Sequence, residues 1–188
     1  DLRRSRGLGD VYKRQGPREF LGSSGGLNTN LLMFLSALAI VLFSTCGYFY
    51  WHFPGWCCFL MNVVALHMAG TVIHDASHNS AHKNPLVNAI LGHGSALLLG
   101  FAFPVFTRVH LQHHAHVNDP ENDPDHFVST GGPLWLIAAR FFYHEIFFFK
   151  RRLWRKFELW EWFFSRLVVF IIVGLSIYYG FVLSLIHI

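Results

Sequence analysis

Histidine is the residue type through which this chain can do chemistry, because closely spaced imidazoles occur in two groups. The first group is HDASHNSAH, in which histidines recur every four residues, and the second is HLQHH, with spacings of three and four. On an α-helix these spacings place the imidazoles along one face. Neutral imidazole is a good ligand for iron, zinc and copper. We therefore predict a metal site built from His74, His78, His82, His110, His113 and His114.

The number of imidazoles exceeds what one metal ion needs. One ion takes about three or four protein ligands, as catalytic zinc does. Five or six histidines therefore indicate two metals, or one metal whose ligands have hydrogen-bonding partners. Acidic residues close in sequence can accept a hydrogen bond from the distal nitrogen of a ligating histidine. The residues predicted to give this support are Asp75, His116, Asp119, Asp123 and Asp125.

The segments that must position these histidines have the composition of membrane helices. Only 14% of the residues are charged, and no Asp, Glu, Lys or Arg lies between Glu19 and Asp75 or between Lys83 and Arg108. An average soluble domain has about 25% charged residues, whereas uncharged apolar runs of about 20 residues are typical of membrane spans. The predicted spans are Leu31–Tyr50, Cys57–Ile73 and Phe163–Leu185, and the first two form a hairpin.

The apolar segment between the two histidine groups is predicted not to cross the membrane. It extends over Pro85–Phe106, and Gly92, Gly94, Gly100 and Pro104 interrupt it. A single crossing would put the two histidine groups on opposite sides of the bilayer, where they could not share a metal. We therefore expect a re-entrant or interfacial pair of short helices, which is tolerated where the backbone packs against protein.

The chain after the second histidine group predicts a loop, an interfacial helix and a basic anchor. NDPENDPD, from Asn118 to Asp125, is predicted to be a loop because residues before proline avoid the helical region. The aromatic segment Phe127–Phe149 favours a helix along the membrane interface. Lys and Arg favour the cytoplasmic side, so the basic cluster Lys150–Lys156 places both histidine groups there. The predicted fold is an all-α integral-membrane helical bundle with a cytoplasmic histidine-rich cap.

Composition also excludes some functions and sets the domain bounds. The net charge of +4 comes from basic residues beside apolar spans, which topology or anionic lipid explains better than nucleic-acid binding. The three cysteines lie in or beside apolar spans and predict no disulfide framework. Residues 1–15 are basic and polar, share no pattern with the rest, and are expected to be a foreign or disordered tail. One incomplete domain is expected over residues 28–183.

The two histidine groups and the acidic loop together resemble the membrane fatty-acid-desaturase and hydroxylase superfamily. Within it, HDASHNSAH and HLQHHAHVNDPENDPDH are similar to the β-carotene hydroxylases of cyanobacterial and plastid type, and the similarity covers roughly residues 28–181. The superfamily has a third histidine group after a further pair of spans, so the chain is expected to be C-terminally truncated and its metal site incomplete. The resemblance implies two irons ligated by His74, His78, His110, His113 and His114, with His82 in addition.

The resemblance implies an oxygenase that acts on a membrane-soluble substrate. Such enzymes use iron and dioxygen to hydroxylate the β-ionone ring of a carotenoid, converting β-carotene to zeaxanthin, with electrons from a ferredoxin-type donor. The basic cluster is predicted to dock that donor at the cell or thylakoid membrane. A fatty-acid desaturase and a carotenoid ketolase of the same superfamily remain alternatives. Two alternatives belong to other classes of protein. One is a zinc-dependent membrane hydrolase, which the absence of HExxH disfavours. The other is a non-catalytic membrane fragment.

Overall fold

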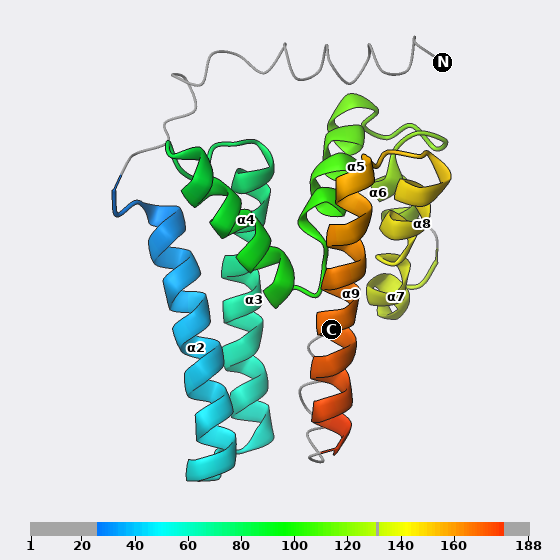
Figure 1. The fold of residues 1–188 in the computed structure, drawn as a ribbon. Helices are drawn as coiled ribbons and strands as arrows, with labels where there is room; N and C mark the ends of the chain where they lie inside the picture. Colours follow the sequence, from blue (N-terminus) through cyan, green and yellow to red (C-terminus); the bar gives the residue numbers. More distant parts are fainter. Residues whose placement is uncertain (1–25, 131, 179–188) are drawn as a thin grey trace.

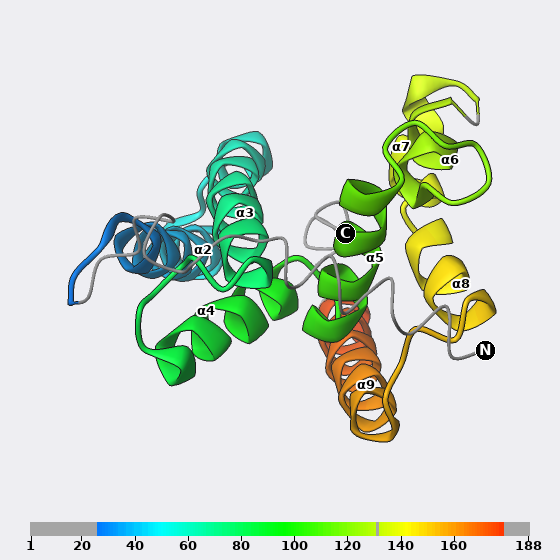
Figure 2. The same ribbon diagram turned by 90° about the horizontal axis from the view of Figure 1, so that it is seen from above.

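The computed structural model describes residues 26–130 and 132–178, and every regular element in these ranges is helical, which confirms the all-α prediction. The long helices are α2 (Thr29–Trp51), α3 (Gly55–Ser77) and α9 (Lys156–Tyr178). The shorter elements are α4 (Pro85–Leu98), α5 (Phe103–Ala115), α6 (Pro124–Thr130), the 3-10 helix η2 (Leu134–Leu136), α7 (Ile137–Arg140) and α8 (Tyr143–Lys150). Helices α2, α3 and α4 form one group and α5 to α9 the other, as Figures 1 and 2 show. The predicted tail, residues 1–15, lies outside the described residues.

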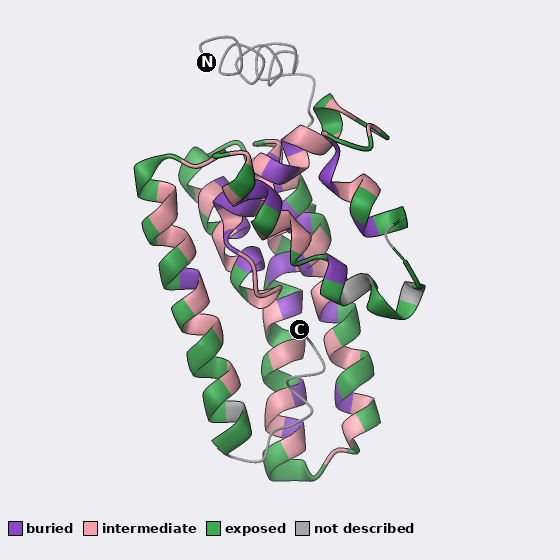
Figure 3. Cartoon of the chain, turned by 90° about the vertical axis from the view of Figure 1, so that its right-hand side faces the viewer, coloured by how far each residue is buried: buried purple, intermediate pink, exposed green. Residues whose placement is uncertain are grey.

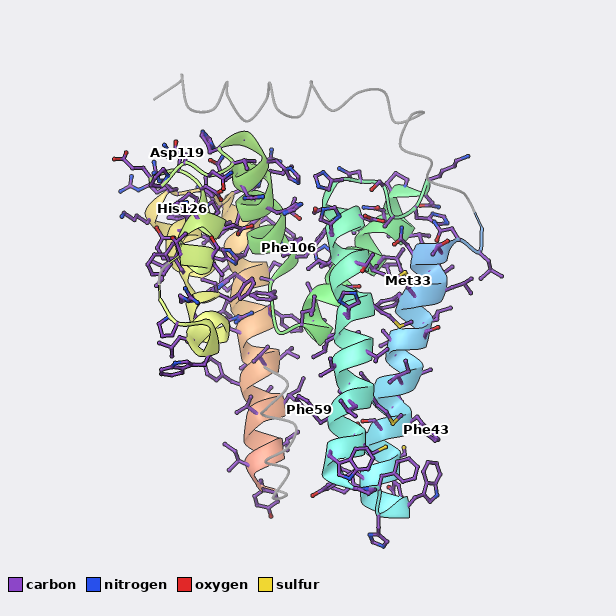
Figure 4. The ribbon with its side chains drawn as sticks, turned by 180° about the vertical axis from the view of Figure 1, so that it is seen from behind. Met33, Phe43, Phe59, Phe106, Asp119 and His126 are labelled. Atoms are coloured by element: carbon purple, nitrogen blue, oxygen red, sulfur yellow. The ribbon has the colours of Figure 1, made fainter. Side chains whose placement is uncertain are left out.

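Helices α2 and α3 form the predicted hairpin, and both are long and apolar enough to cross a membrane. Ser44 Oγ donates to Asn62 Oδ1 at 3.0 Å, which joins the two helices through a partly buried polar pair. Buried residues gather in the upper part of the molecule, whereas the lower halves of the long helices are largely exposed (Figure 3). Phe43 and Phe59 lie on that lower part (Figure 4) and are exposed. Exposed apolar side chains on helices of this length are suited to contact with lipid.

The predicted pair of short helices is confirmed by α4 and α5, which meet at an angle of 96° across a short break. Gly100 in the break has φ +74, a conformation that glycine adopts without strain. Pro104 lies in the first turn of α5, where its missing N–H costs no helical hydrogen bond. Gly92 of α4 lies against the ring of Phe103, so a Cβ there would collide with that ring. The sharp bend therefore depends on a glycine in the break and a close approach of the two helices.

Helix α9 packs against α5 through polar contacts. Arg108 of α5 pairs with Glu158 of α9 at 2.8 Å, and both side chains are largely buried. Ser165 Oγ donates at 3.0 Å to the carbonyl of Phe101, which lies in the break just before α5. The predicted third span begins inside α9, but residues 179–185 lie outside the described part of the chain. The membrane crossing of this segment therefore stays a prediction.

The prediction of one interfacial helix over Phe127–Phe149 is wrong. The segment forms four short pieces, because Gly132 has φ +143 and Pro133 follows it, and neither residue continues a helix. The predicted acidic loop is also shorter than expected, since α6 begins at Pro124, a residue favoured in the first helical turn. Trp135 and Phe142 are strongly exposed, so the broken segment still presents an aromatic surface.

Candidate metal centre

Four of the predicted ligands meet where the ends of α3 and α5 face each other. One ring nitrogen from each lies within 4.8 Å of the others. Nε2 of His110 lies 3.0 Å from Nε2 of His78 and 3.0 Å from Nε2 of His114. We refer to these residues as the four-histidine group: His74, His78, His110 and His114.

The chemistry of this donor set fits a metal ion. A neutral imidazole nitrogen carries either one hydrogen or one lone pair, so a single Nε2 cannot form good hydrogen bonds to two other Nε2 atoms at once. Two nitrogens that each lie about 2.1 Å from one ion, at right angles, are about 3.0 Å apart. The spacing around His110 therefore matches neighbouring positions in a metal coordination sphere.

His110 lies in the C-terminal half of α5, and burial keeps its imidazole neutral near neutral pH. Burial lowers the pKa of His110 to about 3, and the neighbouring imidazoles of His114, His74 and His78 add to this effect. Phe106, one turn earlier, stacks on the His110 ring with centroids 5.3 Å apart, and Figure 4 shows it on the side of α5 that faces α3. A metal competes with a proton for the imidazole lone pair, so a lowered pKa favours binding near neutral pH.

The turn after α3 is fixed by Asn88, a buried side chain from α4. Its Oδ1 accepts the backbone N–H groups of Ala81 at 3.0 Å and His82 at 3.3 Å, and its Nδ2 donates to the carbonyl of Ala76 at 3.0 Å. His78 caps the C-terminus of α3 immediately before this turn. Asn88 therefore fixes the backbone on both sides of a predicted ligand.

The structure does not bring His82 to the four-histidine group. The helix was expected to continue through it, but α3 ends at Ser77 and Asn79 adopts φ +57. The ring of His82 instead bonds to two backbone groups, accepting from the N–H of Asn84 at Nδ1 and contacting the carbonyl of Gly26 at Nε2. The prediction that His82 shares a helix face with His78 is therefore wrong.

Asp75 lies beside the ligand that it was predicted to support. Its Oδ1 lies 3.1 Å from Nδ1 of His74, and its Oδ2 accepts from Nδ2 of Asn30 on α2 at 3.0 Å. A carboxylate at one ring nitrogen directs the lone pair to the other nitrogen. Asp75 thus links α2 to an imidazole of the four-histidine group.

His113 lies beside the group, but its ring turns towards a second cluster. Nδ1 of His113 lies 2.9 Å from Oδ1 of Asp123 and 3.5 Å from Oδ2 of Asp125. Its ring centroid is 5.6 Å from that of His114 and 6.4 Å from that of His110. The three residues His113, Asp123 and Asp125 also meet the distance requirement for holding a metal ion.

The two carboxylates of this cluster stay ionised. Burial alone would raise the pKa of Asp123, but hydrogen bonds from His113 and from the backbone N–H groups of Asn118 and Asp125 outweigh it and lower the pKa. Burial likewise would raise the pKa of Asp125, but the hydrogen bond from His144 and the electrostatic attraction of His144 and His113 together outweigh it and lower the pKa. Both groups are therefore charged acceptors for imidazole N–H donors.

Two predicted supporting residues lie elsewhere. His116 contacts the carbonyl of Gln112 through Nδ1 at 3.1 Å and ends α5. Asp119 accepts hydrogen bonds from the backbone N–H groups of Glu121 and Asn122, so it shapes its own turn. Both side chains make local contacts in this structure, and their support of metal ligands stays a prediction.

His144 is a site residue that the sequence did not single out. Its Nε2 lies 2.8 Å from Oδ1 of Asp125, although α8 follows that aspartate by more than a dozen residues. It stands alone among aromatic residues, with no second histidine at helical spacing in its own segment. Only the tertiary packing of α6 against α8 brings it to the carboxylate.

The fold and the site define a helical protein with membrane-length helices and a group of histidines that could hold a metal ion. The chain belongs to the fatty acid desaturase family, whose model matches residues 49–188. It is similar to the dihydrorhizobitoxine desaturase of Bradyrhizobium elkanii, at 38% identity over 71 residues. That similarity covers 32% of this chain and 18% of the relative, so the chain spans less than two thirds of that protein's length. No solved structure matches the chain.

Proposed function

We propose that this chain belongs to a membrane oxidoreductase that uses two histidine-held irons and dioxygen to oxidise a lipid-soluble hydrocarbon. The observation that carries the proposal is the convergence of three Nε2 atoms on one point, with Nε2 of His110 3.0 Å from those of His78 and His114. Iron bound there supplies the electron-transfer and oxygen-activating chemistry that side chains lack. Membership in the fatty acid desaturase family supports the same reaction class.

The residues of the chain have three tasks in this reaction. His78, His110 and His114 hold the metal as neutral donors, since the pKa of each is lowered, first of all by burial. Asp75 orients His74 through the contact at Nδ1. The four-histidine group is exposed on the side of His74 and His114, which leaves room for substrate and for further ligands.

The proposed substrate is the β-ionone ring of a carotenoid, hydroxylated at carbon 3. The similarity of HDASHNSAH and HLQHHAHVNDPENDPDH to β-carotene hydroxylases supports it. A carotenoid dissolves in the membrane interior and would approach along the exposed apolar faces of α2 and α3, where Phe43 and Phe59 lie. The geometry of the four-histidine group suits other oxidations of hydrocarbons equally well.

A desaturase is the second candidate, because the relative described above is named a desaturase. The two functions separate by product. We would express the protein in cells that accumulate β-carotene and measure bound iron, carotenoids and fatty acids, with His110→Ala as the metal-site control. The proposal expects iron and 3-hydroxylated carotenoids that His110→Ala abolishes. New double bonds with unchanged carotenoids would establish the desaturase, and a purified protein without iron would refute both.

We also propose that the histidine side of the membrane is cytoplasmic and receives an acidic, ferredoxin-type donor. The basic cluster Lys150–Lys156 supports this orientation through the preference of Lys and Arg for that side. Arg151 is occupied, since its guanidinium donates to the carbonyl of Glu121, so the exposed Lys150 and Lys156 are the better contacts for a donor. Changing both to Gln should slow reduction by ferredoxin and weaken its dependence on ionic strength. An unchanged rate and salt dependence would contradict this docking.

A further inference from the structure

Asp123 is a fixed acceptor at the base of the acidic segment, residues 118–125. Its side chain is almost fully buried, and Oδ1 lies 2.9 Å from Nδ1 of His113. The backbone N–H of Asn118 donates to Oδ2 at 2.8 Å, and that of Asp125 donates to Oδ1 at 2.9 Å. A carboxylate held by two backbone donors cannot rotate freely, so it imposes one orientation on the imidazole that it contacts.

This contact decides which nitrogen of His113 can bind a metal. When Nδ1–H donates to a carboxylate, the lone pair of the neutral ring lies on Nε2. His113 comes from the same end of α5 as His110 and His114, and its ring lies 5.6 Å from that of His114. Asp123 therefore makes Nε2 the donor atom that His113 offers.

Helix α8 holds the acidic segment at two points. Nε2 of His144 lies 2.8 Å from Oδ1 of Asp125. The guanidinium of Arg151, the C-cap of α8 about two turns further on, donates to the carbonyl of Glu121 at 2.7 Å and to Oδ1 of Asn122 at 2.9 Å. The two contacts lie on either side of Asp123 in sequence, so α8 fixes the backbone that carries the acceptor for His113.

We propose that His144 and Arg151 of α8, acting through the acidic segment, are positioning residues that set the ring orientation of His113 at the metal centre. The inference rests on the proposed function and on the prediction from the sequence that His113 is a further iron ligand. By this proposal α8, which carries neither histidine group, also influences how the protein binds the metal.

A metal bound directly by His113, Asp123 and Asp125 is the competing assignment, because their ligand atoms also lie close together. The hydrogen bonds favour the positioning role. Both oxygens of Asp123 already accept backbone N–H groups, and the separation of 2.9 Å from Nδ1 of His113 is that of a hydrogen bond. The two assignments differ in the number of ions that the protein binds.

The experiment titrates the full chain in detergent with Co²⁺ and records its visible absorption bands. His144→Phe keeps the ring, which contacts Phe141 at 5.1 Å, but removes the donor to Asp125. His144→Gln restores an N–H donor near the position of Nε2. His126→Phe is the matched control, since His126 lies next to Asp125 and its ring is not part of the bonds described here. Far-UV circular dichroism of each metal-free variant checks folding.

The positioning role predicts that His144→Phe weakens Co²⁺ binding about 10- to 100-fold and shifts the absorption bands. His144→Gln should recover most of the affinity, and His126→Phe should resemble the wild type. If His144→Phe fails to fold, Asp125→Ala breaks the same link from the other side and should give the same band shift. Arg151→Gln should produce a smaller change of the same kind.

Three results would overturn the inference. Wild-type affinity and absorption in a folded His144→Phe would show that α8 does not influence the metal. Equal loss in His144→Gln and His144→Phe would show that the hydrogen bond is not the cause. Loss of one whole Co²⁺ equivalent in Asp123→Asn, with the remaining bands unchanged, would establish the separate site. Failure of the wild type to bind Co²⁺ would instead refute the proposed function.

Discussion

Replacing Asn88 with alanine tests whether the turn after α3 depends on one buried amide. The change removes the acceptor of the Ala81 and His82 N–H groups, at 3.0 and 3.3 Å, and leaves both donors buried without that partner. The carbonyl of Ala76 keeps a bond from the N–H of Asn79. A buried donor without a partner costs about 1–3 kcal/mol. Because the second bond is long, we expect a total loss of about 2–4 kcal/mol in the free energy of unfolding.

A loss of that size should be visible in thermal unfolding of the metal-free protein in detergent. For a chain of this length it corresponds to a decrease in Tm of about 5–12 °C. Asn88→Asp keeps the Oδ1 acceptor for both N–H groups, but it replaces the donor to Ala76 with a second oxygen that carries charge when ionised. When all three proteins are compared at a pH that keeps this carboxyl protonated, we expect its Tm to lie between those of the wild type and Asn88→Ala. A Tm of Asn88→Ala within about 1 °C of the wild type would refute the reasoning, because two buried donors cannot lose their acceptor without cost.

Two further predictions concern the histidines. His110→Ala should abolish tight Co²⁺ or Fe²⁺ binding, whereas His82→Ala should keep the metal affinity within about threefold of the wild type. Titration with the metal measures both, and an equal loss of affinity in the two variants would show that His82 is a ligand. Without metal, burial lowers the pKa of His110 to about 3 from 6.5, so the unfolded chain binds more protons between these values. Stability should therefore fall as pH decreases from about 7 to about 5, and less so in His110→Gln; identical pH profiles of Tm would contradict this.

The sequence predicted the parts of the fold and site that depend on local rules. The hairpin of α2 and α3 follows from apolar length, and the juxtaposition of His110 and His114 follows from helical spacing. The end of α3 was not predictable in this way. It depends on the left-handed conformation of Asn79 and on the hydrogen bonds to Asn88 of another helix. For this reason the helix does not continue through His82 as expected.

The supporting residues show the same division between local and tertiary causes. Asp75 follows His74 directly and contacts it, as predicted from proximity. Asp119 is closer in sequence to the second histidine group than Asp123 is, but its carboxylate bonds to its own turn. His144 reaches the site only because α8 packs beside α6, and no spacing rule connects it to Asp125. Sequence proximity therefore identifies the acidic segment. Which of its carboxylates contacts a histidine of the site depends on the tertiary fold.

The bend between α4 and α5 is the feature on which a shared metal centre depends. His78 and His110 are 32 residues apart in sequence, and a straight helix over that distance would separate them by about 48 Å, more than the hydrocarbon thickness of a bilayer. Their Nε2 atoms lie 3.0 Å apart because the chain turns between α3 and α4 and then bends by 96° between α4 and α5. A segment that crossed the membrane once could not produce this contact, so the imidazoles support a re-entrant path for α4 and α5. The bent apolar segment and the four-histidine group therefore form one structural feature, because Gly100 in the break and the close approach of Gly92 to Phe103 permit the bend that brings the two histidine groups together.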